Sequence, residues 1–195
     1  MTKQMGILIG VVLFCLFLVV GSCGSYNGMV NDKEAVDQKI GQVQNVYQRR
    51  ADLIPNLVET VKGYASHEKG TFESVTKARS DATKITLSPN TTPEDLKKWQ
   101  AAQGELSAAL GKLMMLKEAY PELKANQNFL ALQTQIEGTE NRIATERRQW
   151  QIAVKEYNVR IKRFPASIIA SLGGFKPAPF FEAEEGAKTA PKIKF

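Results

Sequence analysis

The sequence predicts an all-α protein: an N-terminal transmembrane helix followed by an antiparallel bundle of three long helices, or four if the first of them breaks near Gly70. Two observations support this fold class. Residues 5–20 include no charged or strongly polar side chain, and two later segments carry apolar residues at alternating steps of four and three. That spacing is the heptad pattern of packed helices, in which each helix buries one apolar stripe.

The apolar N-terminal segment is long enough to cross a membrane. Together with the lightly polar residues 21–25 it reaches about 20 residues, the length at which an α-helix spans a hydrocarbon core. Three interpretations are open: an uncleaved signal anchor, a cleaved signal peptide, and a lipoprotein signal in which Cys23 becomes the lipidated N-terminus. Lys3 precedes the segment, so the positive-inside rule favours an N-terminus inside and a domain outside. The charge difference is small, and the opposite orientation also stays open.

The first apolar stripe follows this segment. One position in its series is charged, Arg50, so the guanidinium must either reach water or meet a carboxylate. Pro55 removes a backbone donor and is expected to kink the helix. No turn signature stands between residues 63 and 72, so we expect one continuous helix over about 27–86, with a break near Gly70 as the alternative. The apolar positions of the series are Val36, Ile40, Val43, Tyr47, Ile54, Leu57, Val61 and Tyr64.

A second helix is expected after the linker at 87–91. Thr92 is a typical N-cap, and Pro93 stands in the first turn, where its missing N–H is harmless. The helix is expected to end near Ala119, before Pro121. Its apolar face consists of Leu96, Trp99, Leu106, Leu110, Leu113 and Met114 or Leu116.

A third helix is expected over about 127–163, followed by a short amphipathic turn at 166–172. Its heptad series includes one acid, Glu140, and one base, Arg147. These charges and Arg50 predict ion pairs in the interior or at an interface, which more often fix helix register than add stability. The alternative is that they lean outward at the edge of the stripe. The apolar members are Ile136, Ile143, Trp150, Val154, Tyr157, Ile161 and Phe164. The expected division of the chain is a short N-terminal segment, a signal anchor, a helical domain and a flexible tail, at 1–4, 5–25, 26–172 and 173–195.

The stretch Arg49–Glu68 resembles the LemA family signature, which runs close to RR-x-DLIPNLV-x-TVKGYA-x-HE. The resemblance covers about residues 26–183. It implies a bacterial membrane protein with one N-terminal transmembrane helix, an α-helical domain and no settled biochemical activity, and it favours the uncleaved anchor. Later blocks that resemble the family occur in order at Thr76–Ser80, Glu140–Ala144, Glu156–Asn158 and Phe164–Pro165.

The composition offers little catalytic chemistry. The 26 Lys and Arg exceed the 20 Asp and Glu only mildly and are dispersed, which argues against a nucleic-acid partner. Cys15 and Cys23 both lie near the N-terminus, so the helical domain can hold no disulfide or zinc cage. His67 is the only histidine, and no phosphate loop, nucleophile elbow or paired-histidine metal motif accompanies it. We predict no enzyme activity and no cofactor.

The leading functional hypothesis is a membrane-anchored helical scaffold that self-associates and organises or shapes the bacterial inner membrane. It follows from the continuous first helix, which would leave the stripe Val36, Ile40, Val43 and Tyr47 without enough partner in its own chain and so expose an interface. Arg50, Glu140 and Arg147 are the candidate register residues. The candidates for contact with lipid headgroups or an acidic partner are Lys155, Arg160, Lys162 and Arg163.

The alternative hypothesis is a monomeric module that binds a peptide or small ligand. Arg49, Arg50, Asp52 and Asn56 would then form a polar notch at the Pro55 kink. A weaker third possibility is a signalling input domain, which would need a separate protein partner for its output. The sequence does not identify the ligand, the partner or the number of subunits.

Overall fold

The computed structural model describes residues 2–88 and 91–181, and every element in that part of the chain is helical. The long helices are α1 (Thr2–Lys62), α2 (Lys69–Lys84), α3 (Pro93–Met115) and α5 (Gln127–Lys162). Short elements complete the order: a 3₁₀ turn at Leu116–Glu118, α4 (Pro121–Lys124) and α6 (Ala166–Leu172). The chain divides into two compact units, a first unit of residues 1–38 with 152–178 and a second unit of 39–151 with 179–195.

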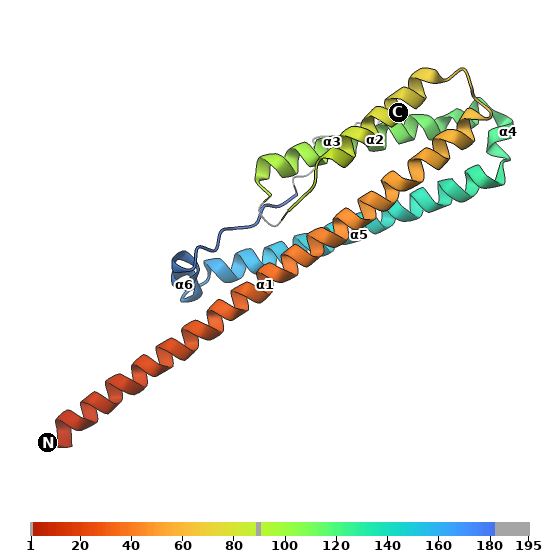
Figure 1. Ribbon diagram of the computed structural model, residues 1–195. Helices are drawn as coiled ribbons and strands as arrows, with labels where there is room; N and C mark the ends of the chain where they lie inside the picture. The colour runs from red at the N-terminus through yellow and green to blue at the C-terminus, as the bar shows by residue number, and fades with distance from the viewer. Residues whose placement is uncertain (1, 89–90, 182–195) are drawn as a thin grey trace, which may run out of the picture. The chain divides into compact units, whose positions relative to one another are not determined.

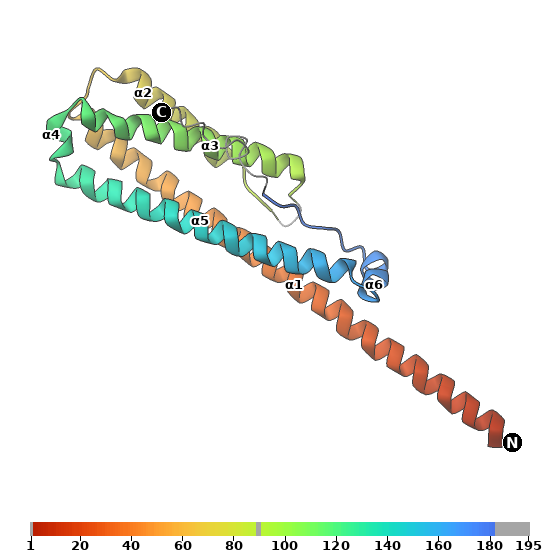
Figure 2. The ribbon, with the colours of Figure 1, turned by 180° about the vertical axis from the view of Figure 1, so that it is seen from behind.

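The expected continuous helix over 27–86 is wrong, because the chain reverses at residues 63–68. Within the second unit, α2 folds back from the end of α1 and packs beside α3 (Figures 1 and 2). The turn is centred on the fully buried Ala65, whose N–H donates to the Val61 carbonyl at 2.9 Å and whose carbonyl accepts the Glu68 N–H at 3.1 Å. The four-helix alternative is therefore the observed one.

One core explains why apolar residues recur on both sides of this turn. Val61, Ala65, Phe72 and Val75 all belong to the same buried cluster of the second unit, so both arms of the turn present apolar residues to one interior. A stripe that continues across a reversal cannot be told from a stripe on one helix by periodicity alone. The remaining members of the cluster come from α1, α2, α3, α4 and α5: Ile54, Leu57, Val58, Ala78, Ala82, Leu106, Ala109, Leu110, Leu113, Leu123, Phe129 and Ile136.

The stripe that was expected to lack a partner is buried inside the single chain. Val36, Ile40, Val43 and Tyr47 are each at most 7% exposed. In the second unit the Tyr47 ring packs edge-on against Trp99, with ring centroids 4.5 Å apart. This stripe is therefore not exposed in the single chain, so the reason for expecting an interface between copies there does not hold.

The starts of the later helices follow the sequence signals. Thr92 accepts the Asp95 N–H at 3.1 Å, which confirms the predicted cap with Pro93 at the first position. Asn126 caps α5 in the same way, by accepting the Phe129 N–H at 2.9 Å. Phe164 departs from the expectation, because this last member of the second stripe is 83% exposed. The predictions for residues 1, 89–90 and 182–195, which include most of the expected tail, fall outside the described residues.

The buried stripe yields a stability prediction. Replacing Ile40 by alanine should lower the free energy of unfolding by about 2–5 kcal/mol, because it removes buried methylene and methyl groups from a packed interior. Thermal unfolding of the detergent-solubilised full chain, followed by circular dichroism, measures this. The exposed Gln38→Ala is the control and should stay within about 0.5 kcal/mol. A fall in particle mass with unchanged stability would instead make the stripe an interface between copies.

Candidate functional site

The most deeply buried charge in the described part of the second unit is Arg50, whose side chain is 1% exposed. One nitrogen, Nη1, donates to Ser107 Oγ at 2.8 Å and pairs with Glu140 Oε1 at 2.6 Å. The other, Nη2, donates to Gln103 Oε1 at 2.7 Å. Gln103 in turn donates to the Ala82 carbonyl at 3.2 Å. One guanidinium thus links α1 to α3 and α5, and through Gln103 to α2.

Glu140 is the carboxylate that Arg50 meets, and it is 43% exposed. Because its carboxylate still contacts water, the pair avoids much of the desolvation cost of a fully buried ion pair. Arg147, the other charge of the second stripe, lies elsewhere: its guanidinium stacks 4.6 Å from the centre of the Phe181 ring. Burial raises the pKa of Tyr47, and the neighbouring Arg147 and Arg50 partly offset that rise.

The four residues proposed for a notch do not line one cavity. Arg49, Asp52 and Asn56 are exposed on one face of α1, where Asp52 accepts a hydrogen bond from Gln48 at 2.7 Å. Arg50 lies in the core instead. Their spacing explains the difference, since steps of three and four keep Arg49, Asp52 and Asn56 on the same helix face while Arg50 is rotated away from it.

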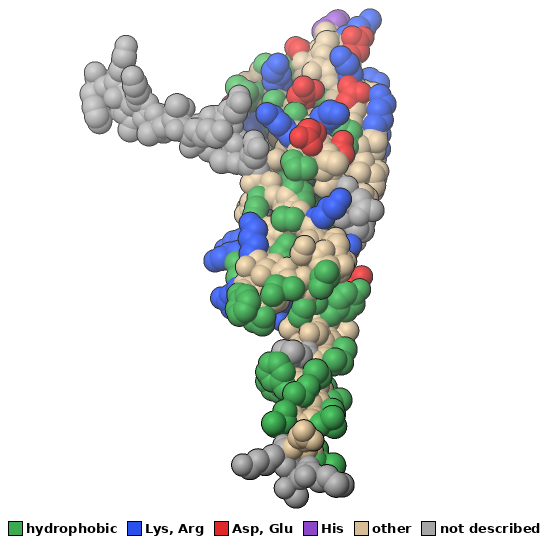
Figure 3. Space-filling model, turned by 90° about the vertical axis from the view of Figure 1, so that its left-hand side faces the viewer, with side chains coloured by type: hydrophobic (Ala, Val, Ile, Leu, Met, Phe, Trp, Pro, Cys, Tyr) green, Lys and Arg blue, Asp and Glu red, His purple; other side chains and the backbone are tan. Residues whose placement is uncertain are grey.

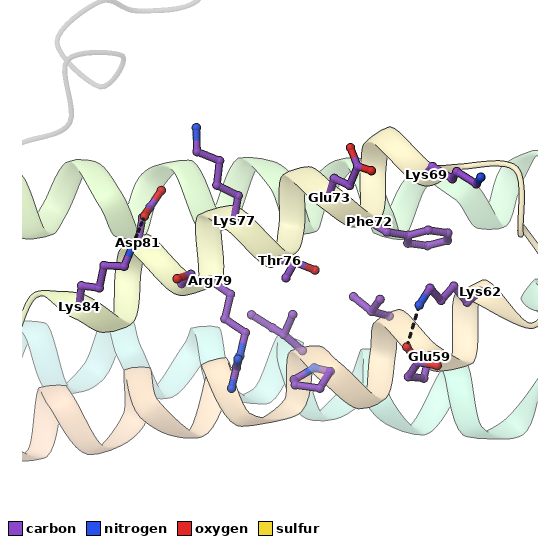
Figure 4. Close-up of a pocket in the computed structure, with 14 residues that line it drawn as sticks. Glu59, Lys62, Lys69, Phe72, Glu73, Thr76, Lys77, Arg79, Asp81 and Lys84 are labelled. Carbon is purple, nitrogen blue, oxygen red and sulfur yellow. Dashed lines mark hydrogen bonds and ion pairs between the residues drawn. The ribbon is translucent and has the colours of Figure 1, made fainter.

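A groove nevertheless lies beside Pro55, between α1 and α2, with a volume of about 880 Å³ (Figure 4). We call it the α1–α2 groove. Its apolar floor consists of Ile54, Pro55, Val58 and Phe72. The charged residues along it are the basic Lys62, Lys69, Lys77, Arg79 and Lys84 and the acidic Glu59, Glu73 and Asp81.

Three charged side chains of the α1–α2 groove, Lys69, Lys77 and Glu73, make no hydrogen bond or ion pair within the described residues, so the bases among them exceed the acids by one. Glu59 is held by Lys62 at 3.1 Å, and Asp81 by Lys84 at 2.9 Å, a contact that lowers the pKa of Asp81. Arg79 extends toward α1 (Figure 4), where it donates to a backbone carbonyl at 2.7 Å. In the described part of the chain no hydrogen bond or ion pair engages the remaining bases, Lys69 and Lys77.

Sequence reasoning missed the α2 side of this groove because it treated residues 63–72 as helix interior. With a continuous helix, Phe72 and Lys77 could not face Pro55. A usable signal was present in the spacing of Lys69, Lys77 and Lys84, which places bases at intervals of about two helical turns.

The described residues contain no group of three or more His, Cys, Asp or Glu able to hold a metal ion. His67 is exposed in the α1–α2 turn. Cys15 and Cys23 are free and exposed on α1. The N-terminal part of α1 is long and apolar enough to cross a membrane, and its side chains are exposed.

In the first unit, the candidate residues for lipid or acidic-partner contact are exposed near the C-terminal end of α5. They are Lys155, Arg160, Lys162 and Arg163. Arg160 differs from the others because its guanidinium forms two hydrogen bonds with the carboxylate of Asp32 on α1. The other three make no ion pair within the described residues.

The buried network yields a second stability prediction. Arg50→Ala should lower the free energy of unfolding by about 3–5 kcal/mol, because it leaves Gln103, Ser107 and Glu140 without their partner. Arg49→Ala, one position earlier on the exposed face, should change it by about 0.5 kcal/mol or less. Thermal unfolding of both variants measures the difference. Equal stability of the two would mean that Arg50 has no structural role.

Residues 39–195 match the LemA family. Magnetosome proteins MamQ 1 and MamQ 2 of Paramagnetospirillum magneticum are each 26% identical to the chain over 182 residues, covering 84% of it and 67% of the relative. Protein LemA of Metamycoplasma hominis is 24% identical over 162 residues, covering 83% of the chain and 71% of the relative. Neither the family description nor these names denote an enzyme. Because the family match extends over most of its length, the chain belongs to the LemA family.

Proposed function

We propose that this protein is a non-enzymatic adaptor, anchored in the bacterial inner membrane by α1, whose α1–α2 groove binds an acidic amphipathic peptide segment of a partner protein. LemA family membership and the apolar N-terminal part of α1 support a membrane-associated helical protein. The groove is the observation that carries the binding function.

The shape of the groove favours a peptide over a small molecule. Its lining on α2 extends from Lys69 to Lys84, which at 1.5 Å per residue is about 22 Å. A groove lining of that length, with apolar residues at one part of it and charged residues along the rest, suits an amphipathic helix of roughly 15 residues. The free Lys69 and Lys77 supply charge complementarity for acidic side chains flanking the peptide's apolar face.

A self-associating scaffold is less well supported by the geometry. The argument for it required an unpartnered stripe at Val36–Tyr47, and that stripe is buried within the single chain. The mass of the detergent-solubilised chain separates the two functions, because the adaptor is monomeric without its partner whereas a scaffold forms large uniform particles.

For the membrane arrangement, we favour a single pass with the N-terminus inside and the helical domain outside. In this arrangement the apolar segment is an uncleaved anchor. The alternative is a lipoprotein attached through Cys23. Mass spectrometry of the purified chain separates these two, because cleavage before Cys23 would remove the apolar segment and add acyl chains.

The groove is tested with labelled 15-residue amphipathic peptides whose polar faces are acidic, neutral or basic. Fluorescence anisotropy should detect binding of acidic members to the full chain in nanodiscs, and the double variant Lys69→Glu/Lys77→Glu should weaken it about tenfold through charge repulsion. The same exchange at the exposed Lys97 and Lys98 of α3 is the matched control and should have little effect.

A steric variant completes the test. Thr76 is exposed and lines the groove, so Thr76→Trp should occupy it and abolish peptide binding. Ser74→Trp adds the same side chain at an exposed α2 position outside the lining and should leave binding intact. Peptide binding that survives Thr76→Trp would exclude the groove as the site.

A further inference from the structure

The segment that follows α5 in the first unit exposes three large apolar side chains at intervals of four residues. Phe164 is 83% exposed, Ile168 55% and Leu172 85%. Along α6 this spacing places Ile168 and Leu172 on one helix face, and Phe164 lies just before the helix, between α5 and α6. Single exposed apolar residues are common, but a row of them marks an interaction surface. We call these three residues the α6 apolar row.

Basic residues adjoin the α6 apolar row. Lys162 and Arg163 immediately precede Phe164, are exposed, and make no ion pair within the described residues. Figure 3 shows hydrophobic side chains gathered next to Lys and Arg side chains on the face that it presents. Apolar residues flanked by Lys and Arg are typical of segments that lie in the interface of an anionic bilayer.

Contacts inside the first unit place this segment beside the end of the apolar N-terminal stretch. Tyr157 is electrostatically coupled to Asp37, and Arg160 bonds Asp32, so α5 runs antiparallel to α1 and approaches its apolar part as residue numbers rise. After α6, the Phe175 ring meets the Tyr26 ring edge-on, with centroids 5.3 Å apart. Residues on either side of α6 thus contact α1 at the level between Tyr26 and Asp32.

That level corresponds to the membrane interface. Tyr26 directly follows residues 5–25, the segment expected to cross the bilayer. Interfacial helices bury their apolar face roughly 5–10 Å into the boundary between headgroups and acyl chains, and tyrosine is enriched at that depth. A segment tied to Tyr26 is therefore at the depth where such side chains reach the bilayer.

We propose that the α6 apolar row inserts into the bilayer interface next to α1, with Lys162 and Arg163 binding anionic lipid headgroups. The protein would then contact the membrane at two points, and the second would fix the rotation and depth of the first unit. This inference rests on α1 crossing the bilayer and is independent of peptide binding in the α1–α2 groove.

The test uses the full chain in nanodiscs that contain phosphatidylglycerol. In a Cys15→Ser/Cys23→Ser background, Leu172→Cys carries an environment-sensitive fluorophore. A quencher on the upper acyl chain of the lipid should quench this probe strongly. The matched control is Leu130→Cys, an exposed apolar position of the second unit, whose probe should be quenched by aqueous iodide and not by the lipid. A third probe on Cys15 alone, with only Cys23 replaced, should be quenched deep in the bilayer and reports on the span itself.

Two further results decide the inference. Lys162→Glu/Arg163→Glu should reduce lipid quenching of the Leu172 probe in anionic nanodiscs and change it little in neutral ones. Iodide quenching at Leu172 equal to that at Leu130 would overturn the proposal. A Leu172 probe protected from both quenchers would also overturn it, because it would indicate coverage by a second copy. If the Cys15 probe is not quenched deep in the bilayer, α1 does not cross the membrane and the premise of this inference is wrong. Circular dichroism of each variant verifies its helix content.

Discussion

The second unit depends on the guanidinium of Arg50, a charge held in the interior with 1% exposure. A buried charge without partners costs several kcal/mol, so the helices around it are constrained to supply oxygens at defined positions. They do so from two helices: Gln103 and Ser107 from α3, and Glu140 from α5. Gln103 then extends the constraint to α2 through the Ala82 carbonyl. A shift of any one helix by a turn would leave a buried polar group unsatisfied, which makes this network the natural determinant of register.

The α1–α2 groove is a consequence of the same arrangement. Arg79 of α2 donates to the Ala51 carbonyl, one residue after Arg50, so α2 is held against α1 at the point where the network forms. Farther along, the two helices share Ile54, Val58 and Phe72 as the floor of an open groove. This part of α1 thus has two distinct faces, one closed on the core through Arg50 and one open beside Pro55. A binding surface that rests on a fixed register is pre-organised, which reduces the entropy cost of binding.

The first unit presents a different kind of surface. Its helices meet through Arg160 and Asp32, and through Tyr26 and Phe175, and these contacts leave the α6 apolar row facing outward beside a membrane-length apolar helix. Polar residues would be the expected choice at Phe164 and Leu172 if that surface faced only water. The proposed adaptor would benefit from a defined position on the membrane, and the proposed second lipid contact would supply it.

The sequence by itself determined the all-α class, the membrane-length apolar segment, the capped start at Thr92, and the anomaly of a charge within the first stripe. These are local signals, carried by residues within a few turns of one another. The turn at 63–68 was not readable, because both of its arms pack on one core and, within the described residues, the only residue with positive φ is Gly174. Only the tertiary structure decided that Arg50 meets Glu140 and not another carboxylate, since the two stand 90 residues apart. It also decided which side of Pro55 is open and that Phe164 leaves the stripe, because those outcomes depend on which helices return to cover each face.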